Sequence, residues 1–275
     1  VAVFAAIGTM ILQALKPESL KAFGRFLWAR KAKTAIVLIV LVGGVYGLTR
    51  AAAALSGGPG ATSELEKGEA WPAYRGGVRR RGYVPDEHGE PLSGGVQWSF
   101  MQYKTIYSTP AVMGNRVYVS TADKGIFKDQ GAIFCLDADS GEVAWKYEPG
   151  DFRATYSSPS VTEKYVVCGE GLHFTRDARI TCLDRSSGKR LWEHRTESHV
   201  ESSPCIALGN VYIGAGDDGL YCIALDPNDD GSPDIRWHLS GEEFPDCETS
   251  PAVWEKKVYF GLGEGGQAVC CANAD

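Results

Sequence analysis

The sequence predicts an all-β fold built from repeated four-stranded units, because two independent markers recur at one period. The first is a tryptophan that closes a strand, at spacings of 47, 47 and 45 residues: Trp98, Trp145, Trp192 and Trp237. The second is a Ser-Pro or Thr-Pro pair that opens a strand, at spacings of 49, 45 and 47 residues: Pro110, Pro159, Pro204 and Pro251. A period of about 45 residues with four strands per unit is typical of β-propeller blades. The chain is therefore expected to contain about four blades of an incomplete ring.

Each unit contains short apolar or alternating runs bounded by Gly, Asn and Asp, as expected for strands joined by tight turns. In the first unit these runs are residues 109–114, 115–122, 131–138 and 141–148. The second and third units repeat the series, and the fourth contains three runs before Asp275. Trp98 is expected to end the last strand of one further blade whose other strands lie elsewhere, since a propeller ring can close with strands from both chain ends.

The repeated residues are predicted to hold the blades together. Each tryptophan can bury its ring between blades while its indole N–H finds a partner there. Gly141 and Gly188 close the turns before two of the tryptophans, and Asp137 and Asp184 are expected to accept backbone hydrogen bonds within those turns. Function is therefore expected in residues that depart from the repeat.

The eight cysteines are placed as packing residues rather than as a disulfide framework. Cys135 and Cys182 share one repeat position, and the third unit is aligned with Ala224 there. A position that accepts both Cys and Ala is typical of a small buried side chain. Cys270 and Cys271 are adjacent in the matching strand of the fourth unit, so one is expected to face each side of the blade.

The first 55 residues predict attachment to a membrane. Residues 1–33 combine an apolar segment with a basic amphipathic helix, and residues 34–55 form an apolar run interrupted by Arg50, which we interpret as a transmembrane helix. Residues 1–55 carry a net charge of +6, with six basic residues before the run. Because positive residues stay on the cytoplasmic side, everything after the run is expected to be extracytoplasmic.

Two alternatives stay open for this region. The first 15 residues are either the remnant of another transmembrane helix or an upstream sequence with the start at Met10. Residues 34–55 are either an anchor or a secretory signal that is cleaved near residues 51–54. In both interpretations, the rest of the chain is exported from the cytoplasm.

The remaining chain divides into a linker and the repeat region. Residues 56–70 are rich in Gly, Ser, Pro and Glu without periodicity, as in a flexible linker, and residues 71–275 contain the propeller. Residues 56–275 carry a net charge of −12, which argues against a nucleic acid as partner.

Three motifs point to a known family. The closures at residues 136–145 and 183–192 follow the pattern Leu-Asp-x-x-x-Gly-x-x-x-Trp, and residues 71–76 read Trp-Pro-Ala-Tyr-Arg-Gly. Together with the Ser-Ser/Thr-Pro strand openings, they resemble the pyrroloquinoline-quinone-like repeat family, the quinoprotein alcohol dehydrogenase-like β-propellers. The resemblance covers about residues 71–275. It is specific for the fold and weak for function, since the repeated residues join the blades.

The resemblance implies a choice between functions. The family contains dehydrogenases and non-catalytic members, such as the lipoprotein of the outer-membrane barrel-assembly machinery. We expect the non-catalytic role: a propeller anchored in the cytoplasmic membrane that binds a protein or ligand on the periplasmic side, without an assigned catalytic residue. The alternative is a dehydrogenase that oxidises alcohols or sugars with pyrroloquinoline quinone (PQQ), which needs a tryptophan against the quinone, calcium-binding carboxylates and an aspartate base. A sensor domain is the third candidate.

Two departures from the repeat are candidate sites. The expanded third closure matches the first half of a calcium loop at Asp226, Asn228, Asp230 and Asp234. Trp237 stands where the bidentate acid is expected, so a plain polar hairpin is the alternative. Residues 170–179 form a longer, non-repeated loop, and loops at the faces of a propeller commonly carry binding groups. Its candidate binding residues are His173, Arg176, Asp177 and Arg179.

Two further features have a structural interpretation beside a functional one. Cys270 and Cys271 resemble the vicinal disulfide of the quinone-dependent alcohol dehydrogenases, but two small buried residues are the interpretation we favour. Arg79, Arg80 and Arg81 could bind an anionic group, although such a cluster is more often a solvated surface.

Overall fold

The computed structural model of the protein describes residues 71–80, 94–100, 104–124 and 129–275. All of them belong to the second of two compact units, Ala61–Asp275. The amphipathic helix, transmembrane helix and linker predicted within residues 1–70 lie outside the described residues. In the described ranges, no helix of the length and hydropathy needed to cross a bilayer is found.

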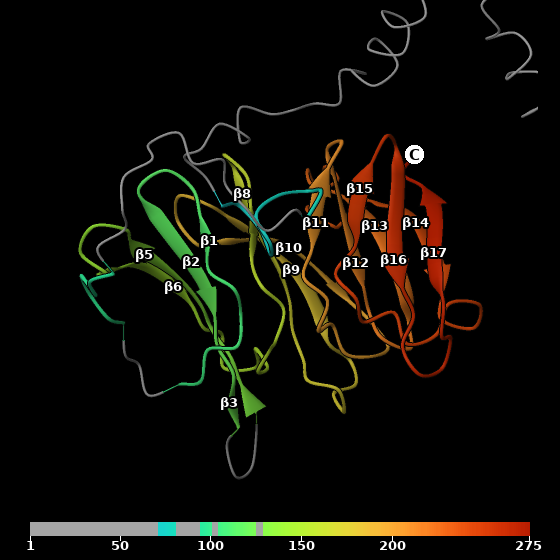
Figure 1. Cartoon of the computed structure of the whole chain (residues 1–275), viewed down its shortest axis with the longest axis horizontal. Helices are drawn as coiled ribbons and strands as arrows, with labels where there is room; N and C mark the ends of the chain where they lie inside the picture. The colour runs from blue at the N-terminus through green and yellow to red at the C-terminus, as the bar shows by residue number, and fades with distance from the viewer. Residues whose placement is uncertain (1–70, 81–93, 101–103, 125–128) are drawn as a thin grey trace, which may run out of the picture. The chain divides into compact units, whose positions relative to one another are not determined.

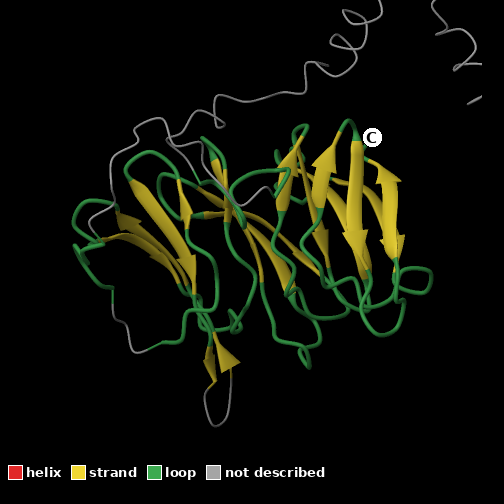
Figure 2. Ribbon diagram, in the orientation of Figure 1, coloured by secondary structure: helices red, strands yellow, loops and turns green. Residues whose placement is uncertain are grey.

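The described chain consists of strands and loops without a helix (Figure 2), and its main sheets lie side by side as blades (Figure 1). Blade 1 contains β1 (Ala111–Val112), β2 (Arg116–Ser120), β5 (Ile133–Asp137) and β6 (Val143–Tyr147). Blade 2 contains β7 (Ser160–Val161), β8 (Tyr165–Gly169), β9 (Arg179–Asp184) and β10 (Arg190–Arg195). Blade 3 contains β11 (Cys205–Ala207), β12 (Asn210–Gly214), β13 (Gly219–Ala224) and β14 (Ile235–Ser240). Blade 4 contains β15 (Ala252–Trp254), β16 (Lys257–Gly261) and β17 (Val269–Asn273).

The strands of each blade follow one another in chain order, and neighbouring strands are antiparallel. This order confirms the predicted all-β fold of four-stranded units. One element was not predicted: β3 (Asp123–Lys124) and β4 (Asp129–Gln130) form a hairpin between β2 and β5 that projects from blade 1 in Figure 1.

The recurring tryptophans join neighbouring blades, as predicted. Three indole N–H groups each donate to a backbone carbonyl of the following repeat: Trp98 to Ala138 (2.8 Å), Trp145 to Arg185 (2.9 Å) and Trp192 to Leu225 (2.8 Å). Trp98 makes this contact from residues 94–100, which form no strand, so the strand expected there is absent from the described segment. The Nε1 of Trp237 is buried and has no partner within the described chain.

Two turn glycines make room for these tryptophan rings. A Cβ at Gly141 would lie 2.6 Å from the ring of Trp98, and a Cβ at Gly188 would lie 2.6 Å from the ring of Trp145. Both glycines also have a positive φ, 74° and 70°. Glycine is therefore required at both positions for its backbone conformation and for the lack of a side chain.

Replacing Gly188 with alanine is expected to lower the melting temperature of the protein. The left-handed conformation costs an L-residue about 1–2 kcal/mol, and the new Cβ must also displace the Trp145 ring. Gly209→Ala is the matched control, because Gly209 has φ 76° but a Cβ added there would meet no atom within 4 Å. An equal drop in melting temperature for both variants would contradict the role of the ring contact.

The Ser-Pro and Thr-Pro markers also join the blades. The backbone N–H of each marker donates to the hydroxyl of the next one: Thr109 to Ser158 (2.9 Å), Ser158 to Ser203 (3.0 Å) and Ser203 to Ser250 (3.0 Å). These pairs are 49, 45 and 47 residues apart, the spacings of the prolines that follow them. The period of the repeat in the sequence therefore equals the number of residues between two positions that are hydrogen-bonded to each other in adjacent blades.

The aspartates of the turns act as predicted. Asp137 accepts hydrogen bonds from the backbone N–H groups of Ser140 and Asp139, both at 3.1 Å, and Asp184 accepts one from Ser187 at 2.8 Å. The bond from Ser140 is the main reason that the pKa of Asp137 lies below its ordinary value.

The cysteine alignment needs one correction. Cys222, and not Ala224, occupies the position of Cys135 and Cys182, because each of these three cysteines lies opposite the closing tryptophan of its blade. Ala224 instead pairs with the first residue of β12, as Asp137 does with the first residue of β2. The third closure contains additional residues before its turn. An alignment of the three closures on their Leu-Asp pairs is therefore shifted in the third unit.

Residues 71–80 cross the inner strands of the blades. Trp71 exchanges two backbone hydrogen bonds with Val112 of β1, at 2.8 and 2.7 Å. Further bonds reach the other blades: Val161 of β7 donates to Pro72 O (2.7 Å), Val253 of β15 to Val78 O (3.1 Å) and Cys205 Sγ of β11 to Val78 O (3.7 Å). This segment therefore contacts the first strand of every blade.

Arg80 fixes this segment, so the prediction of a solvated surface is wrong for this residue. Its guanidinium group donates to four backbone carbonyls at 2.6–3.1 Å: Tyr74, Ser203, Pro204 and Pro251. Burial lowers its pKa. Arg79 lies over the ring of Trp254, with 3.8 Å between the guanidinium carbon and the ring centroid, and Arg81 is outside the described residues.

Candidate functional site

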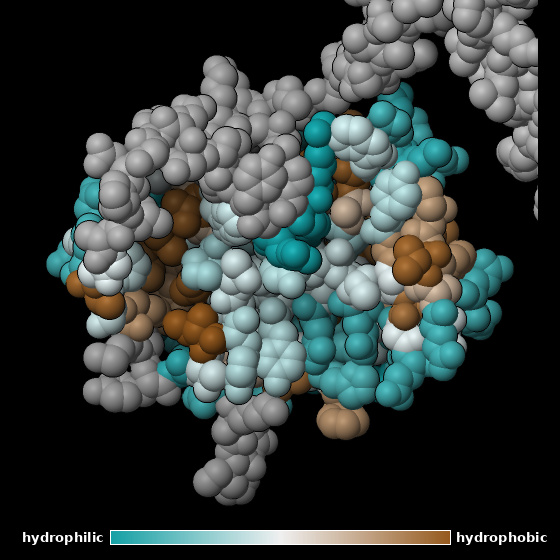
Figure 3. All heavy atoms as spheres, viewed as in Figure 1, coloured by the Kyte–Doolittle hydropathy of each residue, from teal (hydrophilic) through white to brown (hydrophobic). Residues whose placement is uncertain are grey.

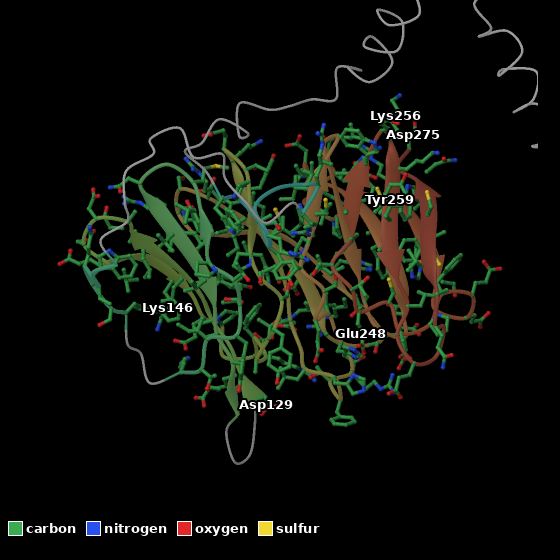
Figure 4. All side chains as sticks on the ribbon, viewed as in Figure 1. Asp129, Lys146, Glu248, Lys256, Tyr259 and Asp275 are labelled. Atoms are coloured by element: carbon green, nitrogen blue, oxygen red, sulfur yellow. The ribbon has the colours of Figure 1, made fainter. Side chains whose placement is uncertain are left out.

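The two ends of the blades differ. One end carries the longer connections, at residues 170–178, 196–204 and 241–251, and is called the loop end here. The other end carries mostly tight turns, such as residues 208–209, together with the expanded connection at residues 225–234, and is called the turn end. Glu248 marks the loop end at the bottom of Figure 4, and Lys256 marks the turn end at the top.

A pocket of about 660 Å³ opens at the loop end. Its lining combines charged and aromatic side chains, among them Asp129, Arg153, Tyr156, His173, Phe174 and Glu201. Phe174 is 94% exposed, which is unusual for a large apolar residue. The pocket is thus formed by the non-repeated loops rather than by the blade core.

Glu201 is a half-buried acid in the lining of this pocket. Its Oε1 is buried and has no hydrogen-bond partner among the described residues. Burial raises the pKa of the Glu201 carboxyl group, and the nearby His199 opposes that shift. A buried acceptor without a partner is costly in a folded protein, so Glu201 is a destabilising group in the wall of the pocket.

A compact cluster of His173, His199 and Glu248 adjoins the pocket. Nδ1 of His173 and Nε2 of His199 each lie 3.0 Å from Oε1 of Glu248. One potential ligand atom from each residue lies within 4.8 Å of the other two. The three side chains come from three different loops, since His173 follows β8, His199 follows β10 and Glu248 follows β14.

His199 is held in place by its surroundings. The residue is 2% exposed, and Oγ of Ser198 lies 3.1 Å from its Nδ1. Gly216, with φ 55°, lies below the ring, where a Cβ would come within 2.6 Å of Cε1. The Nε2 atom therefore points to Glu248 from a fixed position.

The structure separates the four residues predicted for the binding loop. His173 lies in the pocket and in the cluster. Arg176 is exposed and pairs with Asp217 at 3.2 Å, and Asp177 is an exposed turn residue with φ 55°. Arg179 is not at the surface: it begins β9, and its side chain is 3% exposed in an ion pair with Glu170.

Glu201 and Glu248 were not predicted as site residues, although both have a signal in the sequence. Each lies three residues before the proline of its marker, where the first two units have Tyr107 and Tyr156. The two tyrosines pack edge to face, with 4.8 Å between ring centroids. The change from tyrosine to glutamate at one repeat position therefore marks this site in the sequence.

Comparison with known proteins decides the family. Residues 129–273, just over half of the chain, match the family profile described as "Outer membrane protein assembly factor BamB". The chain belongs to this family of PQQ-like repeat propellers.

The curated relatives found are dehydrogenases. The chain is 26% identical over 153 residues to quinohemoprotein alcohol dehydrogenase ADH IIB of Pseudomonas putida, covering 49% of this chain and 22% of the relative. It is 25% identical over 196 residues to ADH-IIG of the same organism, covering 63% and 26%. It is 27% identical over 157 residues to 1-butanol dehydrogenase (cytochrome c) of Thauera butanivorans, covering 51% and 22%. The chain thus spans about a quarter of the length of these relatives.

The similar solved structures are propellers of several kinds. BamB from Moraxella catarrhalis aligns with a TM-score of 0.50 at 18% identity, over 66% of this chain and 53% of that chain. The ADHIIG structure from Pseudomonas putida aligns with a TM-score of 0.57 at 18% identity, over 76% and 39%. The computationally designed Ika4 protein aligns with a TM-score of 0.51 at 16% identity, over 66% and 99%. At these identities the likeness concerns the fold.

The four residues of the predicted calcium loop have separate partners. Asp226 accepts hydrogen bonds from Lys164, at 3.1 Å, and from the hydroxyl of Tyr165. The other three have partners within or near the same loop: Asn228 donates to the Ser232 hydroxyl (3.0 Å), Asp230 accepts from the Ser232 backbone N–H (2.9 Å) and Asp234 forms an ion pair with Arg236 (3.1 Å). Their side chains do not converge in this arrangement, and calcium binding there stays a prediction.

Cys270 and Cys271 lie on opposite sides of β17, as predicted. Cys270 packs against the core between blades 3 and 4, and Cys271 is exposed. Both are unpaired. Cys271 holds the blade position of Cys135 and Cys222 and lies on the side of β17 that faces away from blade 3, where apolar side chains gather over β16 and β17 (Figure 3). The favoured interpretation of two buried residues stays a prediction for Cys271.

Four of the described tryptophans are used in contacts within the protein, and binding of a quinone cofactor stays a prediction. The indole rings of Trp98, Trp145 and Trp192 pack between blades, and Arg79 covers the ring of Trp254.

Proposed function

We propose that this protein is a membrane-anchored scaffold of the cell envelope that binds a protein partner at its loop end. The observation that carries the proposal is the pocket of about 660 Å³ with the 94% exposed Phe174 at its rim. Aromatic residues are enriched at the centres of protein interfaces, and an exposed one beside a hollow is a typical anchor. The repeated residues, in contrast, are used in contacts between blades.

The family supports this proposal at a coarser level. The profile that matches residues 129–273 carries the name of an outer-membrane protein assembly factor, and a role in assembly fits a protein-binding scaffold. The charge distribution and the apolar run at residues 34–55 support anchoring in the cytoplasmic membrane with the propeller on the periplasmic side. The sensor domain is a weaker alternative that shares the same binding surface.

Site-specific photocrosslinking in cells tests the proposal. A photoreactive amino acid at Phe174 is expected to give discrete crosslinked species in the membrane fraction. The matched control is the same amino acid at Leu208, which is 48% exposed at the turn end and should give none of these species.

Two outcomes would contradict the scaffold function. One is the absence of crosslinks at Phe174, or the same crosslinks at both positions. The other is reduction of an electron-accepting dye by the full chain supplied with PQQ, calcium and a primary alcohol, which would favour the dehydrogenase alternative.

A further inference from the structure

We propose that His173, His199 and Glu248 form a binding site for a divalent transition-metal ion of the zinc type. The site goes beyond the partner binding proposed above and does not depend on it. Two imidazole groups and one carboxylate are a common set of protein ligands for zinc, with a further coordination position left open. Imidazole nitrogen also favours zinc and its neighbours over calcium and magnesium, which prefer oxygen ligands.

The distances in the cluster are close to those that a metal ion requires. Zinc bonds of about 2.0–2.1 Å in a tetrahedral arrangement place the ligand atoms about 3.3 Å apart. The nitrogen atoms of His173 and His199 each lie 3.0 Å from Oε1 of Glu248. These two distances therefore differ from the required separation by a few tenths of an ångström, and the two histidine nitrogens lie within 4.8 Å of each other.

His199 has the support expected of a metal ligand. A histidine ligand commonly uses its second ring nitrogen in a hydrogen bond that fixes its orientation. Here Nδ1 lies 3.1 Å from the buried hydroxyl of Ser198, while Nε2 points to Glu248. Gly216 provides the space for the ring. The position of Nε2 is therefore set before any ion binds, so little ordering is needed on binding.

His173 gives solvent access to the site. Its side chain is 57% exposed, so an ion can reach the cluster without opening the fold. His173 and Glu201 also line the pocket. The open coordination position of the ion would thus be available to a water molecule or to a group bound in the pocket.

Titration with zinc tests the proposal directly. The full chain carrying Cys271→Ser is used, because the exposed Cys271 thiol is a competing zinc ligand. We expect calorimetry to show one Zn²⁺ per chain and a rise in melting temperature. His173→Ala and Glu248→Gln should each weaken zinc binding by at least roughly 10- to 100-fold. That is the usual loss of metal affinity when a residue that only hydrogen-bonds to a metal ligand is removed. Co²⁺ should give the intense visible absorption of a four-coordinate site.

Two variants on the same loops serve as controls. Arg176→Ala and Glu243→Gln change exposed charges near His173 and Glu248 without removing a ligand atom, so their zinc affinity should match that of the parent. Melting curves without metal verify that every variant is folded. Absence of stoichiometric zinc binding by the parent, or equal affinity of the parent and the two ligand variants, would overturn the proposal.

Discussion

Replacing Trp192 with alanine is expected to lower the free energy of unfolding by about 3–5 kcal/mol. The side chain is 2% exposed, in the core between blades 2 and 3, and its indole N–H donates to Leu225 O at 2.8 Å. The substitution leaves a cavity between two blades and also a buried carbonyl without its donor. Equilibrium unfolding in urea measures the change.

Two variants separate the contributions of the ring and of its N–H group. Trp192→Phe keeps an aromatic ring but loses the donor, so a smaller loss is expected. Trp145→Ala removes an equivalent but half-buried ring and should also cost less than Trp192→Ala. An unchanged unfolding midpoint for Trp192→Ala would show that this position does not connect the blades.

Replacing Arg179 with methionine is expected to destabilise the protein by about 3–5 kcal/mol, the usual cost of leaving a buried charge unpaired. Nε of Arg179 lies 2.6 Å from Oε1 of Glu170, and the two side chains are 3% and 1% exposed. The double variant Glu170→Gln/Arg179→Met should recover part of the loss, since the buried carboxylate is removed as well; the other two acidic partners of Arg179, Asp151 and Glu193, are more exposed and can be solvated. Arg176→Met, in an exposed pair with Asp217, is the control and should cost less than about 1 kcal/mol.

The effect of Arg179→Met should depend on pH. Burial raises the pKa of Glu170, and Arg179 opposes this shift in the parent protein. Without Arg179, the pKa of Glu170 in the folded variant lies above its value in the unfolded chain. The folded state then binds the proton more tightly, so the penalty is largest above that pKa and decreases as the pH falls through it. This explanation would be contradicted if the difference in the free energy of unfolding between Arg179→Met and the parent were the same at neutral and at acid pH.

Much of the fold could be predicted because its blade contacts depend on particular residue types. The contacts between blades use an indole N–H, a turn glycine and a Ser-Pro hydroxyl, as at Trp145, Gly188 and Ser203. Because only particular residue types supply these groups, the same residues recur in the sequence at one spacing. The path of residues 71–80 could not be predicted in this way. Its hydrogen bonds are accepted by backbone carbonyls, including the four that Arg80 binds. Every residue has a backbone carbonyl, so these contacts cannot be recognised from the residue types in the sequence.

The candidate site was only partly visible in the sequence. His173 stood out because its loop departs from the repeat, but the partners His199 and Glu248 lie in two other loops and become neighbours only when the blades pack. Arg179 looked equally promising in sequence. Its position at the start of β9 places the guanidinium group next to Glu170, inside the protein.

The path of residues 71–80 affects how the molecule comes apart. Repeat proteins in which each unit touches only its neighbours can unfold from their ends one unit at a time. Here residues 71–80 are hydrogen-bonded to Val112 in blade 1 and to Val253 in blade 4, so these two blades are connected to each other as well as to the blades between them. Unfolding of blade 1 or blade 4 would also break the contacts of residues 71–80 with the other blades, and the four described blades should therefore unfold cooperatively.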